Sequence, residues 1–402
     1  MTQPIPIIGA GLAGLTLSRT LLYHNIPSVL YEKAPKAGRR NNYAITLHKT
    51  AYQPLLSILG LDEHAFKRRV AVDAETGGLG SIARDVNLPS HGGLYDTTGS
   101  FRANRARLEE VLGEGVEIRW GYAVEGVEVG VQQGGGGGGG GGVKLQFHNG
   151  EETPCAKLVI GADGVHSIVR KLLVPSAAVA VEILPYAVFN GKYKVEGGQT
   201  FSREYGSALT REANLVSTTQ NNKCALSVSI NESNTDQVYV NWTFSRPALC
   251  NKHDPLHRPS RSLQDAKQIP EELFNEVRAL SGLQPPFSAV FDPERMRNDR
   301  ILHWLMRTTA VPLRDLQTLF NDSGVCLMGD AVHAEPILGG NGANAAIVDG
   351  VTLAEAIAGR ANGSGVETWY TERYGVWKRG VEESVRAIRD MHHAETQMSG
   401  NL

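Results

Sequence analysis

Residues 5–32 read IPIIGAGLAGLTLSRTLLYHNIPSVLYE, and this stretch decides the fold. An apolar run is followed by a G-x-G-x-x-G turn, then by a helix with apolar residues four apart, and then by a second apolar run. This order predicts a strand, a helix and a second strand that open a parallel sheet. Pro6 removes one ladder donor, so the first strand is expected either to begin at Ile7 or to pair on one side only there.

The glycines of this turn predict a dinucleotide-binding site. Gly9 permits the tight turn, Gly11 lets the backbone approach a pyrophosphate, and Gly14 lets the helix pack closely. The helix N-terminus then faces the phosphates. Glu32 ends the second strand, eighteen residues past Gly14, where it can accept hydrogen bonds from ribose hydroxyls. The alternative is an ordinary tight turn with a surface glutamate. The candidate residues are Gly9, Gly11, Leu12, Ala13, Gly14 and Glu32.

The composition is that of a soluble globular protein. The chain has 402 residues, 41% apolar and 20% charged, which suits a large cofactor domain and a smaller second domain. The net charge of -2 gives no field to attract nucleic acid or an anionic membrane. The four cysteines lie outside metal-ligand spacings, so we expect reduced thiols and no metal site. Without a signal peptide or a membrane span, we expect a cytoplasmic monomer or weak dimer.

Two later segments favour FAD over NAD as the bound dinucleotide. Residues 157–170 read KLVIGADGVHSIVR, an apolar strand, a turn at Asp163 and a helix bearing Arg170. Near the other end, an apolar strand closes at Gly329-Asp330, and a glycine-rich turn then opens another helix. Asp330 would meet the ribityl chain or the pyrophosphate. The backbone amides that open the helix would face the flavin ring, and they belong to Gly342, Ala343 and Asn344.

The middle of the chain predicts further strands. Short apolar runs between residues 116 and 160 indicate a small antiparallel appendage that returns to the parallel sheet. Nine consecutive glycines at residues 134–142 interrupt it, and we expect a disordered loop there. Runs between residues 181 and 298 predict a second, mainly antiparallel domain.

These motifs together resemble the class A flavoprotein monooxygenases, the aromatic-ring hydroxylases related to p-hydroxybenzoate and salicylate hydroxylases. Within that family the chain is most similar to tetracycline-degrading enzymes and to fungal enzymes that oxidise indole-alkaloid-type natural products. That similarity rests on residues 39–49 (RRNNYAITLHK) and residues 104–108 (NRARL). The resemblance implies an α/β fold: a Rossmann-like FAD-binding domain of the glutathione-reductase type, a substrate domain with a mixed, mainly antiparallel sheet, and a C-terminal helix.

The expected domains are discontinuous. The FAD-binding domain takes residues 1–70, 100–180 and 299–360, the substrate-binding domain takes residues 71–99 and 181–298, and the C-terminal helix takes residues 361–402.

The resemblance also implies roles for single residues. Arg105 matches the family's R-x-x-L signature and is implied to contact FAD, as is Val124. Either Arg39 or Arg40 is implied to lie near the pyrophosphate and the isoalloxazine. Asp163 is implied to serve both FAD and a transiently bound pyridine nucleotide. The chain departs from the family at two positions beside the expected flavin edge, with Ile337 in place of a second proline and Asn341 in place of glutamine.

The chemistry implied by the resemblance is oxygen insertion. NADPH or NADH reduces FAD, O2 forms a flavin C4a-hydroperoxide, and one oxygen atom passes to an aromatic or polycyclic small molecule of natural-product metabolism. The choice between hydroxylation, epoxidation and Baeyer–Villiger insertion stays open, and no side chain is singled out as catalytic. Alternation places Asn241 and Trp242 on opposite faces of one strand, and either face could line the pocket. The substrate-binding candidates are Asn190, Asn241, Trp242 and Pro336.

Three other functions share parts of this pattern. A flavin-dependent halogenase has the same fold, but the W-x-W-x-I-P segment of that family is absent from this sequence. A dehydrogenase with NAD as its only nucleotide would leave the segments at Asp163 and Asp330 without a purpose. A non-catalytic protein of the Rab-escort type would use the scaffold to bind a protein partner.

Overall fold

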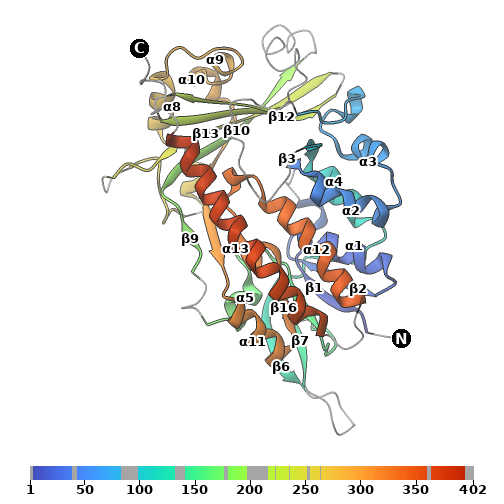
Figure 1. Ribbon diagram of the computed structural model, residues 1–402. Coiled ribbons are helices and arrows are strands. Elements are labelled where there is room, and N and C mark those ends of the chain that lie inside the picture. The colour runs from blue at the N-terminus through green and yellow to red at the C-terminus, as the bar shows by residue number, and fades with distance from the viewer. Residues whose placement is uncertain are drawn as a thin grey trace.

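Figure 1 shows the arrangement of the chain, in which helices α1 (Leu12–Tyr23) and α12 (Gly342–Ala358) lie beside a parallel sheet. A large antiparallel sheet lies at the other end, and helix α13 (Ser364–His393) runs along both parts. This computed structural model describes residues 3–38, 43–82, 98–131, 141–175, 180–196, 216–221, 223–234, 236–250, 254–262, 264–359 and 364–393. The candidates Arg39 and Arg40 and residues 134–140 of the glycine tract lie outside these ranges.

The parallel sheet has the strand order β16-β8-β1-β2-β5. Because β1 pairs with β2 on one side and with β8 on the other, the chain reverses its direction of travel across the sheet at β1. In open α/β sheets such a switch point forms the crevice that binds dinucleotides at the carboxyl ends of the strands. The Rossmann-like fold is confirmed. Its strands are β1 (Ile5–Ile8), β2 (Ser28–Glu32), β5 (Ile118–Trp120), β8 (Val159–Gly161) and β16 (Val325–Leu327).

Pro6 lies inside β1 and not before it. The strand pairs with β2 over all four of its residues, whereas its pairing with β8 includes only Ile7 and Ile8. One-sided pairing at Pro6, the second of the two expected alternatives, is therefore confirmed.

The expectation of an antiparallel appendage is wrong for its first run. β5 joins the parallel sheet beside β2, and Leu30 donates its N–H to the carbonyl of Glu117 over 3.0 Å. The apolar pattern of a short run does not encode which strand edge it will meet, so sequence alone missed this pairing. The antiparallel pair consists of β6 (Val124–Val131) and β7 (Gly142–Phe147), and Gly142 of the glycine tract begins β7.

The helices around the parallel sheet bury apolar side chains such as Leu15, Leu17 and Leu21 of α1. Helix α12 packs very closely on α1. A Cβ built at Gly350 would lie only 2.7 Å from the Cβ of Thr16, so this contact requires glycine. The other elements on this side are the hairpin strands β3 (Ala44–Leu47) and β4 (Phe101–Asn104) and the helices α2 (Lys49–Leu59), α3 (Glu63–Val70), α4 (Arg105–Gly113), α5 (Ile168–Leu173) and α11 (Leu313–Ser323).

The antiparallel sheet has two unlike faces. Its apolar face carries Phe189, Trp242 and Phe244, which pack in a hydrophobic core with α8 (Glu271–Arg278) and α9 (Phe287–Val290). Strand alternation puts the polar residues on the opposite face. The strand order is β11 (Val216–Asn221), β12 (Cys224–Ser233), β13 (Gln237–Pro247), β10 (Tyr186–Glu196), β14 (Arg300–Trp304). Other short elements are α10 (Pro293–Met296), β9 (Glu182–Ile183), β15 (Arg307–Ala310) and β17 (His333–Ala334).

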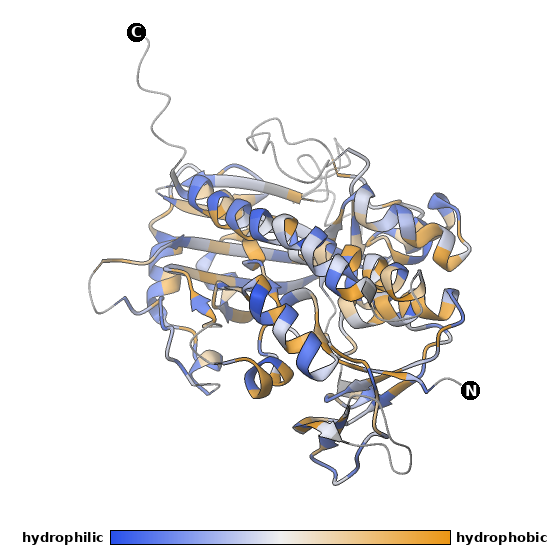
Figure 2. Ribbon diagram, turned by 60° about the horizontal axis from the view of Figure 1, so that its bottom comes forward, coloured by the Kyte–Doolittle hydropathy of each residue, from blue (hydrophilic) through white to orange (hydrophobic). Residues whose placement is uncertain are grey.

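The expected C-terminal helix is confirmed as α13. Trp369, Tyr370 and Trp377 bury one side of it in the core around the parallel sheet. Its end reaches the antiparallel sheet, where His392 Nε2 and Ser245 Oγ lie 3.0 Å apart. Hydrophilic residues follow much of the visible face of this long helix in Figure 2. Within the described ranges, no helix combines the length and the apolar character needed to cross a membrane.

Candidate functional site

A cavity of about 220 Å³ lies where β1, β2 and β8 end. It brings together five of the predicted cofactor-binding residues, which come from separate segments of the chain: Gly9, Gly11, Glu32, Val124 and Asp163. The cavity is lined by Ile8, Gly9, Gly11, Tyr31, Glu32, Lys33, Tyr122, Ala123, Val124, Ala162, Asp163, Gly164 and Ile168.

The N-terminus of α1 opens onto this cavity without a side-chain cap. A Cβ built on Gly11, the N-cap residue, would meet no atom within 4 Å. Gly9 has a φ of +101°, and its Cβ would lie 2.5 Å from the carbonyl oxygen of Ala162. A Cβ on Gly14 would collide with the carbonyl oxygen of Gly9. The fold itself therefore requires glycine at the outer two positions, whereas Gly11 leaves open space in front of the helix, where a phosphate would bind.

Glu32 is held at the edge of the cavity by two backbone groups. Its carboxylate accepts hydrogen bonds from the N–H of Ala10 and the N–H of Ala34, each over 2.9 Å. A carboxylate has about four lone-pair sites. These contacts orient Glu32 and leave it acceptor capacity for ribose hydroxyls.

Asp163 caps the following helix and also faces the glycine turn. Its Oδ2 accepts from the N–H of Ile168 over 2.7 Å and from the N–H of Val169 over 3.3 Å. Its Oδ1 is buried and has no partner in the described part of the chain. A Cβ on Gly9 would lie 2.9 Å from the Cα of Asp163, and both residues line the cavity.

Arg170 joins the second motif to the third. It is only 2% exposed, and its guanidinium donates to the backbone carbonyls of Ala331 over 2.7 Å and Val165 over 2.6 Å. A longer contact of 3.5 Å reaches the carbonyl of Asp330. This buried arginine fixes the position of the Gly329-Asp330 turn relative to the cavity.

Arg105 begins α4 and lies near Asp330. Its Nε donates to Glu109 over 2.9 Å, and its guanidinium also contacts the hydroxyl of Tyr43. Burial raises the pKa of the Asp330 carboxyl, and the nearby His333 and Arg105 oppose that rise. The structure therefore places Arg105 within electrostatic reach of Asp330, although Glu109 and Tyr43 already hold its side chain.

The start of α12 is tied to β3. Asn344 is fully buried, donates from Nδ2 to the carbonyl of Thr46 over 3.0 Å and accepts from the N–H of His48 over 2.9 Å. Asn341, the N-cap residue, makes no side-chain cap hydrogen bond. The Asn344 side chain therefore orients the helix, and the backbone amides from Gly342 onward are the groups that could face a flavin.

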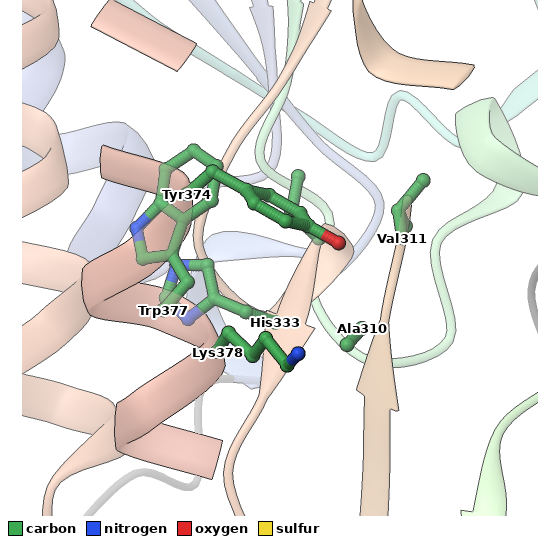
Figure 3. Close-up of a pocket in the computed structure, with 7 residues that line it drawn as sticks. Ala310, Val311, His333, Tyr374, Trp377 and Lys378 are labelled. Atoms are coloured by element: carbon green, nitrogen blue, oxygen red, sulfur yellow. The ribbon is translucent and has the colours of Figure 1, made fainter. Parts of the chain in front are cut away.

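The loop before α12 is anchored by His333. His333 Nε2 lies 2.6 Å from Asp349 Oδ2, and the imidazole stacks on Trp377 with the ring centroids 4.8 Å apart. Asp349 also accepts from Arg373 over 2.8 Å and from the indole of Trp377 over 2.8 Å. Figure 3 shows Trp377 beside His333, with Tyr374 of the same helix directed toward Val311. This cluster orders the loop, which is the role that we favour for His333 over an acid or base.

The substrate candidates fall on both faces of the antiparallel sheet. Trp242 is fully buried on the apolar face, where its Nε1 donates to Asp299 over 2.6 Å. This placement assigns Trp242 to the core and removes it from the residues that could touch a substrate. Asn241 and Asn190 lie on the polar face, and Asn190 donates to Thr243 Oγ1 over 3.0 Å. Pro336 is buried just before the turn at Ile337–Gly339.

The structure adds residues that sequence reasoning missed. Lys33 and Tyr122 line the cavity, and Arg102 of β4 reaches the antiparallel sheet. Lys33 directly follows Glu32, so its place after the ribose acid was a usable signal. Nothing local in the sequence indicated the other two, because their positions depend on which distant strand lies opposite.

These features define a dinucleotide-binding α/β protein, and they fit FAD. Two helix N-termini without side-chain caps, the open space at Gly11 and the unpartnered oxygen of Asp163 are features that suit the phosphates and hydroxyls of a dinucleotide. Glu32 would hold the ribose, the start of α1 the pyrophosphate, and Asp330 either the ribityl chain or the pyrophosphate.

Sequence comparison then gives the family. The chain matches the FAD binding domain family over residues 1–261 and 294–384. The FAD-dependent monooxygenase adaC of Aspergillus niger is 34% identical over 405 residues, which cover 97% of this chain and 92% of that protein. The chain belongs to this family and is an FAD-dependent monooxygenase, as the resemblance predicted.

Solved structures show the same fold at low sequence identity. HpxO of Klebsiella pneumoniae, complexed with FAD and uric acid, has a TM-score of 0.65 at 17% identity and covers 98% of this chain and 90% of its own. The tetracycline destructase Tet(51) has a TM-score of 0.63 at 16% identity and covers 98% of this chain and 93% of its own. The likeness to tetracycline-degrading enzymes is thus confirmed at the level of the fold.

Proposed function

We propose that this protein consumes NADPH or NADH and inserts one oxygen atom from O2 into an aromatic or polycyclic small molecule of natural-product metabolism. The observation that carries this proposal is the meeting of the glycine turn, Glu32 and Asp163 in one cavity, with Arg170 linking that cavity to the Gly329-Asp330 turn. When bound, FAD would accept a hydride and activate O2 for transfer to the substrate. The protein's own residues must bind, orient and shield these reactants.

We assign three tasks to the chain's own groups. The backbone amides at Gly342 and Ala343 would stabilise negative charge on the flavin, because a helix N-terminus carries a partial positive charge. The buried residues 333–336 would exclude water from the site. The polar face of the antiparallel sheet, which includes Asn190 and Asn241, would face the substrate.

We assign the pyridine nucleotide to a positively charged region beside the cavity. The pKa of His166 is lowered by burial and then by the nearby charges of Arg307, Lys171 and Lys33. Several cations therefore surround His166, three residues after Asp163. Anionic phosphates of NADPH or NADH would be attracted to this region.

The direct test is to purify the protein and measure its flavin, its cofactor use and its product. We expect a yellow protein that binds FAD, oxidises NADPH or NADH faster when an accepted substrate is present, and consumes O2. Mass spectrometry of the product should show one added oxygen atom. A protein that neither retains nor binds FAD, or that consumes no O2 across indole, phenol and polycyclic substrates, would contradict the proposal.

A further inference from the structure

Arg102 of β4 lies where the cofactor side of the molecule meets the antiparallel sheet. It pairs across the hairpin with Thr46 of β3, and its Nη1 donates to Thr46 Oγ1 over 3.2 Å. Its Nη2 donates to Ser229 Oγ of β12 over 3.2 Å. Its backbone N–H donates to the carbonyl of Gly80 over 2.7 Å, so the strand that presents this side chain is itself fixed.

The charge of Arg102 has no carboxylate partner among the described residues. Its hydrogen bonds go to two neutral hydroxyls, and its buried Nε has no partner. Burial lowers the pKa of Arg102 to about 10, and no acidic group opposes that effect. The neighbouring arginines differ, since Arg105 pairs with Glu109 and Arg107 pairs with Glu75. An arginine that stays protonated at neutral pH without an anion is arranged to receive one.

Ser229 begins a polar row that crosses the sheet. It pairs with Asn241 of β13, which in turn pairs with Lys192 of β10. Asn241 is 8% exposed, and its Oδ1 has no partner in the described chain. Lys192 lies at the far end of the row, and its ammonium lies 4.8 Å from the ring centroid of Tyr239. The row thus places the open acceptor of Asn241 beside Ser229, the residue that holds the Arg102 guanidinium.

This row lies on the side of the sheet that faces the proposed flavin site. Thr46, which receives one hydrogen bond from Arg102, also accepts one from Asn344 Nδ2 through its backbone carbonyl over 3.0 Å. Asn344 lies in the first turn of α12, the helix whose N-terminus is assigned to the flavin. Thr46 therefore connects the Arg102 guanidinium to the first turn of α12.

We infer that Arg102 determines substrate specificity by binding an ionised oxygen of an acidic aromatic substrate, while Asn241 Oδ1 accepts a hydrogen bond from a hydroxyl of the same molecule. This inference rests on the proposed function, and it narrows the substrate to hydroxylated aromatics that also carry a carboxylate, phenolate or enolate. The guanidinium suits such a group, because its parallel N–H donors match the two oxygens of a carboxylate or of an ionised diketone.

The test compares matched acids and neutral amides on the FAD-loaded protein. Salicylate is paired with salicylamide, and 1-hydroxy-2-naphthoate with 1-hydroxy-2-naphthamide, and the Kd of each is measured by titration calorimetry without turnover. We expect the unmodified protein to bind at least one acid about tenfold or more tightly than its amide. In Arg102→Met the Kd of that acid should rise about tenfold, while the Kd of the amide should change less than twofold.

Two further variants separate charge from folding. Arg102→Lys keeps a cation but loses the parallel donors, so it should retain part of the preference for the acid. Arg278→Met removes an exposed arginine from the far side of the same domain and should leave every Kd unchanged. If Arg102→Met fails to fold, two measurements still test the inference. They are the ratio of the acid Kd to the amide Kd in the unmodified protein and the same ratio in Arg102→Lys.

Several results would overturn the inference. One is the absence of any preference for an acid in the unmodified protein, and another is an equal loss of acid and amide binding in Arg102→Met. If Arg102→Met kept the preference for the acid but had a shifted flavin reduction potential, Arg102 would act on the flavin and not on the substrate. Failure of the proposed function would be seen as no O2 consumption. It is distinguishable from failure of this inference, because calorimetry measures the preference for the acid without any turnover.

Discussion

Arg170 donates a hydrogen bond to the backbone carbonyl of Ala331 over 2.7 Å, and this contact fixes two sequence motifs in one site. Arg170 follows the Asp163 turn, and Ala331 follows Asp330, although more than 150 residues separate them. An arginine that satisfies buried carbonyls cannot be replaced by an apolar side chain without leaving acceptors unpaired. The geometry of the site therefore depends on a residue that need not touch the cofactor.

Replacing Arg170 tests this dependence. Arg170→Met should lower the free energy of unfolding by roughly 2–4 kcal/mol, because a hydrogen bond to a charged group contributes about 1.5–3 kcal/mol. It should also weaken FAD binding, since the Asp330 turn loses its anchor. Urea unfolding and FAD fluorescence titration measure the two effects. Lys171→Met, which changes an exposed neighbour, is the control. Unchanged stability in the Arg170 variant would contradict the anchoring role.

Two glycines of the same turn should respond differently to alanine. Gly14→Ala places a Cβ against the carbonyl oxygen of Gly9, so we expect a loss of about 1–3 kcal/mol in stability together with loss of FAD. Gly11→Ala meets no protein atom within 4 Å, so the apoprotein should melt as the unmodified protein does. Its FAD Kd should nevertheless rise at least tenfold, about 1.4 kcal/mol. Equal melting of the two variants, or tight FAD binding by Gly11→Ala, would contradict this reading.

The sequence predicted the features that depend on local spacing. The Gly9 turn, the acid at Glu32 and the strand before Asp163 each need only a short window, and the structure brings all three to one cavity. Contacts between distant strands could not be predicted in this way. Alternation separated Asn241 from Trp242 but could not say which face the helices α8 and α9 would cover. That choice is made by tertiary packing and not by strand periodicity.

Arg102 shows the same limit at the proposed substrate site. In the sequence it is one of several arginines between residues 100 and 110, and no local pattern sets it apart. Its difference lies in its partners, two hydroxyls from separate strands in place of a carboxylate. Only the fold places Thr46 and Ser229 on either side of it.

Asp349 should control stability at low pH. Burial would raise its pKa, but His333 and Arg373 hold the pKa of this carboxyl below its ordinary value. A lowered pKa in the folded state means that the stabilisation is present above the unfolded pKa of about 3.9 and is lost as pH falls through the folded value. Asp349→Asn should therefore lower the free energy of unfolding by about 3–5 kcal/mol at pH 7. It should also make that free energy depend less steeply on pH at acid pH.

Urea unfolding at a series of pH values between 3 and 7 measures both effects of this substitution. Asp322→Asn, at an exposed position on α11, is the matched control and should change neither quantity. A stability loss in Asp349→Asn that was equal at every pH would mean that packing, and not the charge of Asp349, stabilises the loop before α12.

The cations around His166 lead to a prediction about NADPH. Arg307→Met should raise the KM for NADPH about tenfold, close to 1.4 kcal/mol, with little change in FAD affinity. Bound phosphates would favour protonated His166, whose pKa is low in the free protein. NADPH binding should then take up a proton, and the KM should fall as pH drops below the usual range of histidine. Steady-state kinetics between pH 5 and 8 measure this dependence.

Two variants decide whether the pH effect belongs to His166. His166→Gln should abolish the fall in KM at low pH, because glutamine cannot gain a charge there. Arg314→Met removes an exposed cation on α11 and should leave both the KM and its pH dependence unchanged. If His166→Gln kept the full pH dependence, another group would be responsible, and the phosphates of NADPH would have to bind away from the Asp163 turn.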